Sequence, residues 1–467
     1  MIATHHPAAR HSCALGIAGL LSLATTSVFA SGFALIEQSV SSMGTAYAGA
    51  ASNGQDASTI FFNPALMSRL EGEQMSAGVH AVLPKTEFTG MGTFNSTNPL
   101  VAQVPNLGGS TVPVSSGTGD GGNAGENGYL PHLAYVRDID DRWKFGLTVN
   151  VPFGLSTKYD EGWVGRYSSL QAEIKAINLN PNFSFQVDDH TALGFGISAM
   201  YTSLKYRNNI DYALLDMFGL LDPTGNGNSI LPGAPAPGTS DATSRVDVDD
   251  WGFGFNAGIL LEPSEHTRFG LAYRSKVNLE MGGDLRIAHS ILPAVSDGAT
   301  VNASLPETLM LSGYHEFDQS WAVMADLIWT KWSSINELRI KPDTRSPSII
   351  PLQWEDTTRV AIGVTYRHSA SLTLRTGIAL DETPVPDASV RPTALPDEDR
   401  LWLALGAGYR LTRQLSFDVG YAHLFIDDTD INSTDAYTPP LATGFHRVTG
   451  KYDASVDIIS AQANWTF

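Results

Sequence analysis

The sequence predicts an all-β fold: a transmembrane antiparallel β-barrel of about 14 strands with an N-terminal plug, or hatch, inside its lumen. Three observations lead to this prediction. Only 16% of the 467 residues are charged, whereas an ordinary soluble domain has roughly 25%. Many segments alternate between apolar and small polar residues with a period of two, as half-buried strands do. The joins between these segments alternate between tight polar turns and long loops, which is typical of bacterial outer-membrane barrels.

Residues 1–30 have the layout of a secretory signal peptide. Arg10 precedes an apolar run from Ala14 to Leu23, and Val28-Phe29-Ala30 resembles a cleavage site, so we expect cleavage after Ala30. An uncleaved anchor is the alternative, but a spanning helix needs roughly 20 apolar residues and this run is shorter. The single cysteine, Cys13, lies in this segment, so the chain forms no intrachain disulfide.

Residues 31–72 differ from the rest of the chain. They are rich in Gly, Ala and Ser, too broken by glycine for a strong helix or strand, and too apolar for a disordered tail. A barrel of about 14 strands with a glycine-rich inner face leaves room for a folded segment. We therefore expect residues 31–72 to form the plug and residues 73–467 to form the barrel with its long extracellular loops.

The two faces of the strands indicate which solvent surrounds them. In residues 251–261, for example, Trp251, Phe253 and Phe255 share one face, and Gly252 and Gly254 share the other. A soluble β-sandwich would carry a charged, wet second face, whereas here that face is small and polar. A secreted soluble β protein is the alternative to a barrel, and the aromatic residues that flank the apolar bands favour the barrel.

Fourteen strands can be placed, with twelve to sixteen as the range and an even number preferred. The predicted strands are 73–85, 128–138, 142–151, 172–187, 190–207, 244–262, 265–280, 300–315, 319–341, 354–368, 370–381, 400–411, 413–426 and 451–467. The last strand ends at Phe467, and we expect it to pair with the first, because a membrane sheet tolerates no free edge.

Catalytic and metal-binding motifs are missing from the sequence: it has no G-x-S-x-G, H-E-x-x-H or P-loop pattern, so we expect neither enzymatic activity, nor a cofactor, nor a bound metal. Asp427, Asp428 and Asp430 lack the glycine and bidentate glutamate of a calcium loop. The formal net charge of −19 argues against a nucleic-acid partner, because phosphate contacts need clustered Lys and Arg.

Several charged residues fall on the inward phase of their strands, and two interpretations remain open for them. An ion in a partly dry lumen must be paired, so these residues could clamp the plug to the wall. Alternatively, one or more arginines face the anionic head group of a ligand. The residues are Arg268, Arg274, Asp326, Arg359, Arg400 and Asp418.

The loop 208–243 contains an unexpected apolar cluster. Leu214, Leu215, Phe218 and Leu221 share a helical face, although an external loop should be polar. Exposed apolar surface marks a binding site or a packed lid, so we expect a hydrophobic capture groove, with loop–loop packing as the alternative.

Several motifs, in order along essentially the whole chain, resemble the FadL-type outer-membrane transporters of long-chain fatty acids and aromatic hydrocarbons. The most specific are the plug motif Asn63-Pro64-Ala65 and Pro396-Asp397-Glu398-Asp399-Arg400. The others are Ser31-Gly32-Phe33, the Gly44–Gly49 run, Val151-Pro152-Phe153-Gly154-Leu155, Gly165-Arg166-Tyr167 and Trp329-Thr330-Lys331-Trp332-Ser333.

The resemblance implies passive uptake through a barrel closed by a hatch. A ligand is caught among the external loops, moves to an internal apolar pocket, is released when the hatch N-terminus shifts, and leaves sideways at the third strand. Gly weakens strand pairing and Pro removes a ladder donor, so we expect the lateral gate at Gly146 and at Pro152, Phe153 and Gly154. The ligand-binding candidates are Phe33, Phe61, Phe62, Leu215, Phe218, Leu221, Arg359 and Arg400.

The expected function is therefore the passage of hydrophobic molecules, most of all long-chain fatty acids, across the outer membrane of a Gram-negative bacterium. The expected partners are the hydrophobic ligand, outer-membrane lipid and lipopolysaccharide, and the protein is expected to be a monomer. Four alternatives stay open: uptake of aromatic or alkane hydrocarbons, a general polar porin, an outer-membrane enzyme such as a lipase, and an adhesin or structural barrel. The hydrocarbon alternative predicts an internal pocket without an unpaired Arg or Lys.

Overall fold

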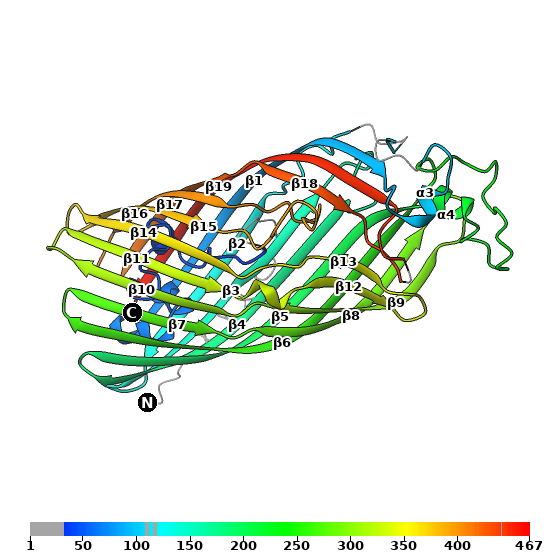
Figure 1. Ribbon diagram of the computed structural model, residues 1–467. Coiled ribbons are helices and arrows are strands. Elements are labelled where there is room, and N and C mark those ends of the chain that lie inside the picture. Colours follow the sequence, from blue (N-terminus) through cyan, green and yellow to red (C-terminus); the bar gives the residue numbers. More distant parts are fainter. Residues whose placement is uncertain (1–31, 108–111, 115–118, 440) are drawn as a thin grey trace, which may run out of the picture.

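The computed structural model describes residues 32–107, 112–114, 119–439 and 441–467. Long tilted strands lie side by side around a cylinder, and the longer connections with helices α3 (Pro99–Ala102) and α4 (Tyr212–Met217) gather at one end (Figure 1). Within the described residues no helix is long and apolar enough to cross a membrane. The expected signal peptide, residues 1–30, lies outside the described residues.

The barrel is a closed antiparallel sheet of fourteen spans, so the predicted fold class is confirmed. Strand β1 pairs with β19 along its whole length, from Gln74 opposite Thr466 to Phe94 opposite His446, and this pairing removes both sheet edges. Nine spans are uninterrupted: β1 (Gln74–Phe94), β2 (Gly128–Asp138), β3 (Trp143–Lys158), β4 (Gln171–Asp188), β5 (Thr191–Asp211), β6 (Asp241–Ser264), β15 (Leu372–Asp381), β16 (Arg400–Arg410) and β19 (His446–Thr466).

The other five spans are interrupted and each contributes two strands to the sheet. They are β7 (Thr267–Arg274) with β8 (Val277–Ala288), β9 (Val295–Leu305) with β10 (Thr308–Glu316), β11 (Trp321–Thr330) with β12 (Glu337–Pro342), β13 (Ser348–Pro351) with β14 (Thr357–Arg367), and β17 (Leu415–Ile426) with β18 (Thr429–Thr434). The predicted continuous strand 319–341 is therefore wrong in its middle, where the 3-10 helix η3 (Trp332–Ser334) separates β11 from β12.

Several strands also extend further than predicted at the end that carries the long loops. Strand β1 continues to Phe94 and β3 to Lys158, instead of ending near residues 85 and 151. The apolar outer face stops earlier than the hydrogen-bonded ladder: Lys85 and Glu87, for example, pair at 2.9 Å on the outer face of β1. Sequence alternation follows the apolar face, so it misses the part of the strand whose outer face is polar.

Below this polar part, the outward face forms an apolar band. Ile197, Phe253 and Ile362 are 60%, 69% and 54% exposed, which is the reverse of a soluble protein's core. The inward residues of the same strands are buried and largely small or polar. The alternation read from the sequence thus has the predicted orientation, with the apolar side outward.

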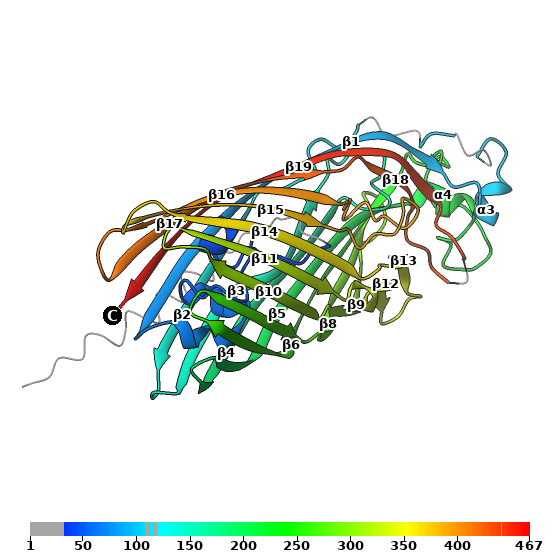
Figure 2. The same ribbon diagram turned by 60° about the vertical axis from the view of Figure 1, so that its left-hand side comes forward.

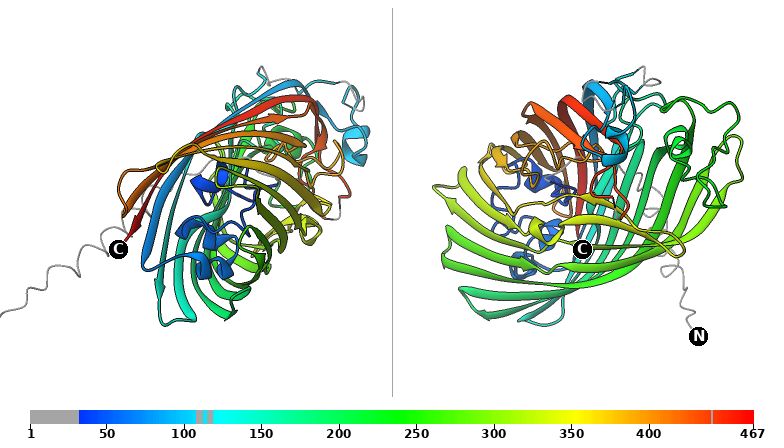
Figure 3. Two further views of the ribbon diagram at one scale, coloured as in Figure 1. Left: turned by 90° about the vertical axis from the view of Figure 1, so that its left-hand side faces the viewer. Right: turned by 45° about the vertical axis from the view of Figure 1, so that its right-hand side comes forward.

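Inside the barrel lies a compact segment that begins at the first described residues. It contains the short helices α2 (Val40–Met43), η1 (Ala57–Phe61) and η2 (Pro64–Arg69), drawn in dark blue within the cylinder in Figure 3. Glycines of the wall make room for it. A Cβ added at Gly377 would lie 2.1 Å from the carbonyl carbon of Thr45, and one at Gly270 would lie 1.9 Å from the carbonyl oxygen of Ala51. The glycine-rich inner face is therefore a close-packed contact surface.

The Asn63-Pro64-Ala65 motif starts η2 and joins it to the wall. The Asn63 side chain accepts a hydrogen bond from the backbone N–H of Ala65 at 2.9 Å, and Pro64 occupies the first helical position, where no backbone donor is needed. The Asn63 amide also donates to the carbonyl oxygens of Ala51 and Ile259 at 2.8 and 3.1 Å. One side chain thus caps a helix, ties it to the preceding segment and anchors both to β6.

Candidate functional site

An apolar cavity of about 90 Å³ lies inside the barrel, on the loop side of the N-terminal segment. We call it the chamber. Its lining is almost entirely carbon and comes from β3, β4, β5, β8, β9, β12 and β13, from the loop that follows β15, and from the N-terminal segment. The lining residues are Phe33, Leu155, Ala172, Glu173, Ile174, Thr202, Leu204, Lys205, Tyr206, Leu279, Met281, Ala303, Leu305, Ile335, Leu338, Ile350, Leu352, Trp354, Pro392, Ala394 and Leu395.

Phe33 closes one side of the chamber within an aromatic cluster. Its ring centroid lies 5.0 Å from that of Trp332, 5.7 Å from that of Trp354 and 6.0 Å from that of Phe153. The η3 interruption places Trp332 there, and a Cβ added at Gly32, where φ is +60°, would lie 2.6 Å from the Trp332 ring. The contacts with Trp332 and Phe153 are edge-to-face, and such contacts stabilise by about 0.5–1.5 kcal/mol each beyond the area they bury, so Phe33 is firmly held.

The same N-terminal segment covers an unpaired part of β3. The β2–β3 ladder ends at the pair Leu133–Val149, so the rest of β3 has no β2 neighbour. The N–H of Leu35 donates to the carbonyl oxygen of Pro152 at 2.8 Å, and the N–H of Gly154 donates to the carbonyl oxygen of Phe33 at 2.9 Å. Residues 33–35 therefore take the place of a strand beside residues 152–154.

The β3 residues predicted from the sequence do not all lie at this discontinuity. Pro152, Phe153 and Gly154 do, and the pairing of β3 with β4 shifts in register between Asn150 and Phe153. Gly146, in contrast, is paired on both sides, with Val136 of β2 and Asn182 of β4. Its missing side chain makes room for Met67 and Ile60 of the N-terminal segment, so the expected opening near Gly146 is wrong.

Arg359 and Arg400 do not line the chamber. Arg400 forms a buried ion pair with Asp397, and Arg359 lies 3.9 Å from Asp381 and donates to the carbonyl oxygen of Ala46 at 3.1 Å. Asp397 in turn accepts a hydrogen bond from the N–H of Gly32 at 2.9 Å. These arginines therefore clamp the N-terminal segment to the wall, which is the first of the two interpretations of the inward charges.

Three of the other inward charges, Asp326, Asp418 and Arg274, also connect to the N-terminal segment, whereas Arg268 lies 3.9 Å from Glu316 and over the Tyr314 ring of the wall. Asp326 accepts from the N–H of Ala50 at 3.1 Å, and the Arg375–Asp418 pair, 2.7 Å apart, donates to Gln55 at 2.6 Å. Two of the predicted ligand-binding residues, Phe61 and Phe62, also pack within the barrel interior away from the chamber. Arg274 stacks over the Phe61 ring at 4.2 Å, and the Phe62 ring lies 5.8 Å from that of Tyr47; neither phenylalanine lines the chamber.

The predicted apolar cluster of the external loop is divided between two packing partners. Leu214 and Phe218 pack with Phe94, Val101 and Phe445, whereas Leu215 and Leu221 pack against the larger core that includes part of the chamber wall. Leu220, between them, remains 56% exposed. Most of the predicted groove residues thus take part in loop–loop packing, and Leu220 with Ile291, which is 64% exposed, leaves apolar surface at the tip.

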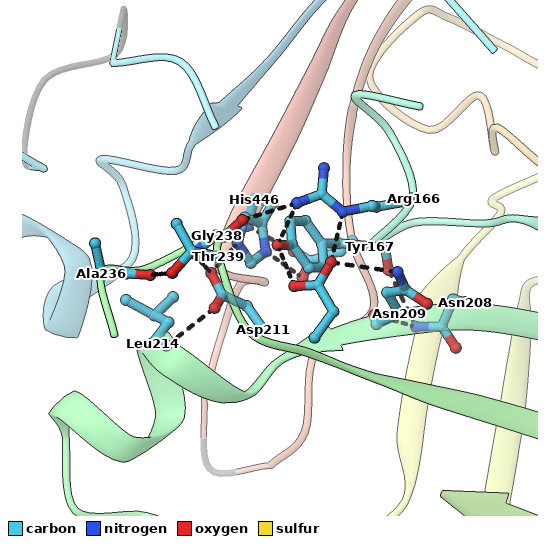
Figure 4. A network of polar contacts seen from close by, with 12 residues as sticks. Arg166, Tyr167, Asn208, Asn209, Asp211, Leu214, Ala236, Gly238, Thr239 and His446 are labelled. Carbon is cyan, nitrogen blue, oxygen red and sulfur yellow. Dashed lines mark hydrogen bonds and ion pairs between the residues drawn. The ribbon is translucent and has the colours of Figure 1, made fainter. Parts of the chain in front are cut away.

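A buried polar network fastens these loops together (Figure 4). Arg166 donates to Asp241 at 2.7 Å, Tyr167 donates to the same carboxylate at 2.7 Å, and His446 lies 3.2 Å from Asp211 and stacks on Tyr167 at 3.9 Å. Burial lowers the pKa of His446, but hydrogen bonds and charges from Asp211 and Asp435 outweigh this effect and raise it to about 9. The network lies at the polar end of β19, outside the apolar band, and ties the connection between β3 and β4 to the ends of β5, β6 and β19.

Sequence reasoning missed most of the chamber. Trp332 and Trp354 lie in interruptions of strands, whereas the sequence predicts them within the strands 319–341 and 354–368. Leu279, Met281 and Leu305 fall on the inward phase of their strands, and this phase is the sequence signal that could have placed them in the barrel interior. Alternation does not show, however, where the inner face widens into a cavity. The described residues hold no group of three or more His, Cys, Asp or Glu side chains suited to a metal ion.

Comparison with known sequences gives one family. Residues 21–467 match the family described as outer membrane protein transport protein (OMPP1/FadL/TodX). The chain is 31% identical over 429 residues to a long-chain fatty acid transport protein of Escherichia coli O6:H1, covering 87% of this chain and 90% of that one. It is 30% identical over 424 residues to outer membrane protein P1 of Haemophilus influenzae, covering 87% and 89%.

Solved structures agree with this result. A Pseudomonas aeruginosa FadL homologue has a TM-score of 0.81 and 27% identity, and the match covers 93% of this chain and all of that one. The Pseudomonas putida toluene transporter TodX has a TM-score of 0.64 over 95% of this chain and 99% of that one; at 17% identity it shows the shared fold alone.

Proposed function

Since the chain belongs to the outer membrane transport proteins of the OMPP1/FadL/TodX family and is therefore a Gram-negative outer-membrane barrel, we propose that it carries long-chain fatty acids through its chamber. One observation carries the proposal: the apolar chamber is closed by Phe33, which belongs to the same short segment that covers the unpaired edge of β3. Filling the chamber and uncovering that edge are therefore coupled events.

The chamber binds the acyl tail of the ligand. Each methylene moved out of water contributes about 0.8 kcal/mol, so affinity grows with chain length. The cavity of about 90 Å³ is smaller than the roughly 300–1,000 Å³ of ordinary ligand sites. A long chain therefore fits only when Phe33 leaves, which makes residues 31–72 a hatch whose first residues move.

Release then follows along the route that the hatch has covered. When residues 33–35 withdraw, Pro152 and Gly154 lose their hydrogen-bond partners, and the side of the barrel beside β3 opens between Val149, which pairs with β2, and Thr157, which bridges to Gly125. The ligand leaves through this lateral gate into the membrane. Capture begins at the loop tips near Leu220 and Ile291, and one barrel contains the whole route, so the protein works as a monomer.

A hydrocarbon ligand is the second candidate, and the charges around the chamber favour it. Among the described lining residues the only cation is Lys205, and it already forms an ion pair with Glu173 at 3.2 Å. Lys205 falls on the outward phase of β5, so it meets the chamber only at its border. Competition between a fatty acid and an alkane of equal length, with and without Lys205→Met, separates the two ligand classes.

The proposal is tested by placing a polar group in the chamber. We expect Met281→Asn to weaken binding of a fluorescent fatty acid by the purified full-length protein by about 1–3 kcal/mol, because the amide would lose its water without gaining a partner. The matched control is Asp284→Asn, which lies on the exposed outer face of the same strand. Equal affinity in both variants, with the barrel folded in each, would rule out the chamber as the binding site.

A further inference from the structure

A second discontinuity of the wall lies away from β3. The β10–β11 ladder ends at the pair Thr308–Thr330, and the β9–β12 ladder resumes only at Val301–Ile340. Between these pairs the described ladders do not join residues 302–307 to residues 331–339, although residues 302–305 pair with β8 and residues 337–339 pair with β13. One bond connects the two segments, from the Lys331 N–H to the carbonyl oxygen of Glu307 at 3.0 Å. Figure 2 shows β9, β12 and β13 together towards the end that carries α3 and α4.

This discontinuity is hollowed from the outside. An open hollow of about 620 Å³, which we call the window, lies at residues 302–304 and 334–337 together with parts of β6 and β8. Its floor is formed by Leu279, Ala303 and Ile335, and these three residues also line the chamber. Only one layer of side chains therefore separates the window from the apolar interior.

The rim of the window is polar and acidic. Asn302, Ser304 and Asn336 supply amide and hydroxyl groups, while Asp250 and Glu280 supply negative charge. No lysine or arginine is among the described lining residues, although Glu337 pairs with Arg339, which lies outside the lining, at 2.6 Å. A carboxylate is repelled by this rim, whereas an uncharged molecule is not.

The height of the window places it at the outer boundary of the apolar band. Asp250 precedes the outward Trp251, which is 56% exposed, and Glu307 forms an ion pair with Lys331 at 3.0 Å beside the hollow. Aromatic residues mark the membrane interface of such barrels. The window thus faces the polar layer that covers the membrane, where hydrophobic molecules from outside first accumulate.

We propose that the window is a second port, through which uncharged hydrophobic molecules such as hydrocarbons, alcohols and esters pass sideways into the chamber without using the external loops. The proposal rests on the chamber being the ligand site, as argued above. Its floor opens by small rotations of Ile335 and Leu279, and neighbouring Ala303 offers little obstruction. Fatty acid anions remain confined to the route through the loops.

Thiol labelling tests the port in the intact protein. In a Cys13→Ser background the chain has no other cysteine, so Ala303→Cys is a single probe of the floor. We expect an uncharged methanethiosulfonate to label it much faster than an anionic one of similar size. We expect Asn336→Trp, which fills the rim, to slow the uncharged reagent by an order of magnitude. Lys341→Trp, exposed on β12, which begins directly after Asn336, is the matched control.

The outcomes separate the port from the chamber. A labelling rate that ignores Asn336→Trp, or an anionic reagent as fast as the uncharged one, overturns the port even if fatty acid binding is normal. Loss of hydrocarbon uptake in Asn336→Trp with unchanged fatty acid binding supports it. If Met281→Asn leaves all binding intact, the chamber itself is refuted, and that result does not depend on how Ala303→Cys is labelled.

Discussion

The change Phe33→Ala tests the coupling between the chamber and the lateral gate. Phe33 is 6% exposed and its ring contacts those of Phe153, Trp332 and Trp354. Truncating a buried phenylalanine costs about 3–5 kcal/mol through lost contacts and the cavity left behind. Because the segment is attached locally, we expect most of this cost to appear as easier detachment of residues 33–35 rather than as global unfolding.

That free energy corresponds to an increase on the order of 10²–10³-fold in the detached population. Hydrogen–deuterium exchange measures it directly, because the N–H of Leu35 and the N–H of Gly154 are protected by each other's segment. Both amides should exchange faster by a comparable factor. In cells, the variant should take up hydrophobic dyes without needing a ligand that fills the chamber.

The matched control is Phe61→Ala, since Phe61 is also a hatch aromatic but contacts Arg274 instead of the chamber cluster. It should loosen η1 and leave the Gly154 amide protected. The reasoning fails if the Gly154 amide exchanges at the native rate in Phe33→Ala. It also fails if both variants accelerate that amide equally, because the hatch would then loosen as a whole.

Three further changes test the rest of the site. Arg359→Met should destabilise the folded barrel by about 3–5 kcal/mol, because it leaves Asp381 buried without its partner, and adding Asp381→Leu should restore stability. Ligand affinity should stay unchanged in both variants. A loss of affinity would instead indicate that Arg359 contacts the ligand head group. Gly377→Val should lower the free energy of unfolding by about 1–3 kcal/mol, because its Cβ would lie 2.1 Å from the Thr45 backbone. An unchanged thermal transition temperature would contradict close packing of the hatch. The pKa of His446 is raised from 6.5 to about 9, so its contribution of about 3 kcal/mol to the stability of the loop network is complete below pH 6.5 and is lost as the pH rises through 9. Loop amides should therefore exchange faster at pH 10 than at pH 6, after correction for intrinsic exchange rates. His446→Gln should remove this difference.

Much of the barrel could be predicted because the surrounding membrane requires a regular alternation of apolar and small polar residues in the sequence. Residues such as Phe253 and Ile362 must face acyl chains, and this requirement repeats every second position along each span. Strand ends are predicted less well, because Lys85 and Glu87 extend β1 into a region where the outer face is polar while the inner face still carries buried residues such as Phe88. The interruption at Trp332 was missed for a similar reason: it depends on what packs inside the barrel.

The candidate site was likewise predicted only in part. Phe33 and the Pro152–Gly154 motif were chosen through a family resemblance, and they meet in the structure, although their roles in transport remain predictions. The inward phase of Arg359 was correct, but alternation gives only the face of a residue and not its partner. Asp381, on the neighbouring strand, and the Ala46 carbonyl of the hatch satisfy that charge, and neither contact leaves a local trace in the sequence.

The double duty of Phe33 has a consequence for the bacterium's defences. One aromatic ring bounds the chamber and belongs to the segment that covers the edge of β3. The proposed mechanism therefore requires the ligand itself to displace this ring, and under it a compound too small or too polar to do so does not pass. A strain carrying Phe33→Ala should therefore grow normally in medium without such compounds, yet be inhibited by lower concentrations of hydrophobic antibiotics and bile-salt detergents.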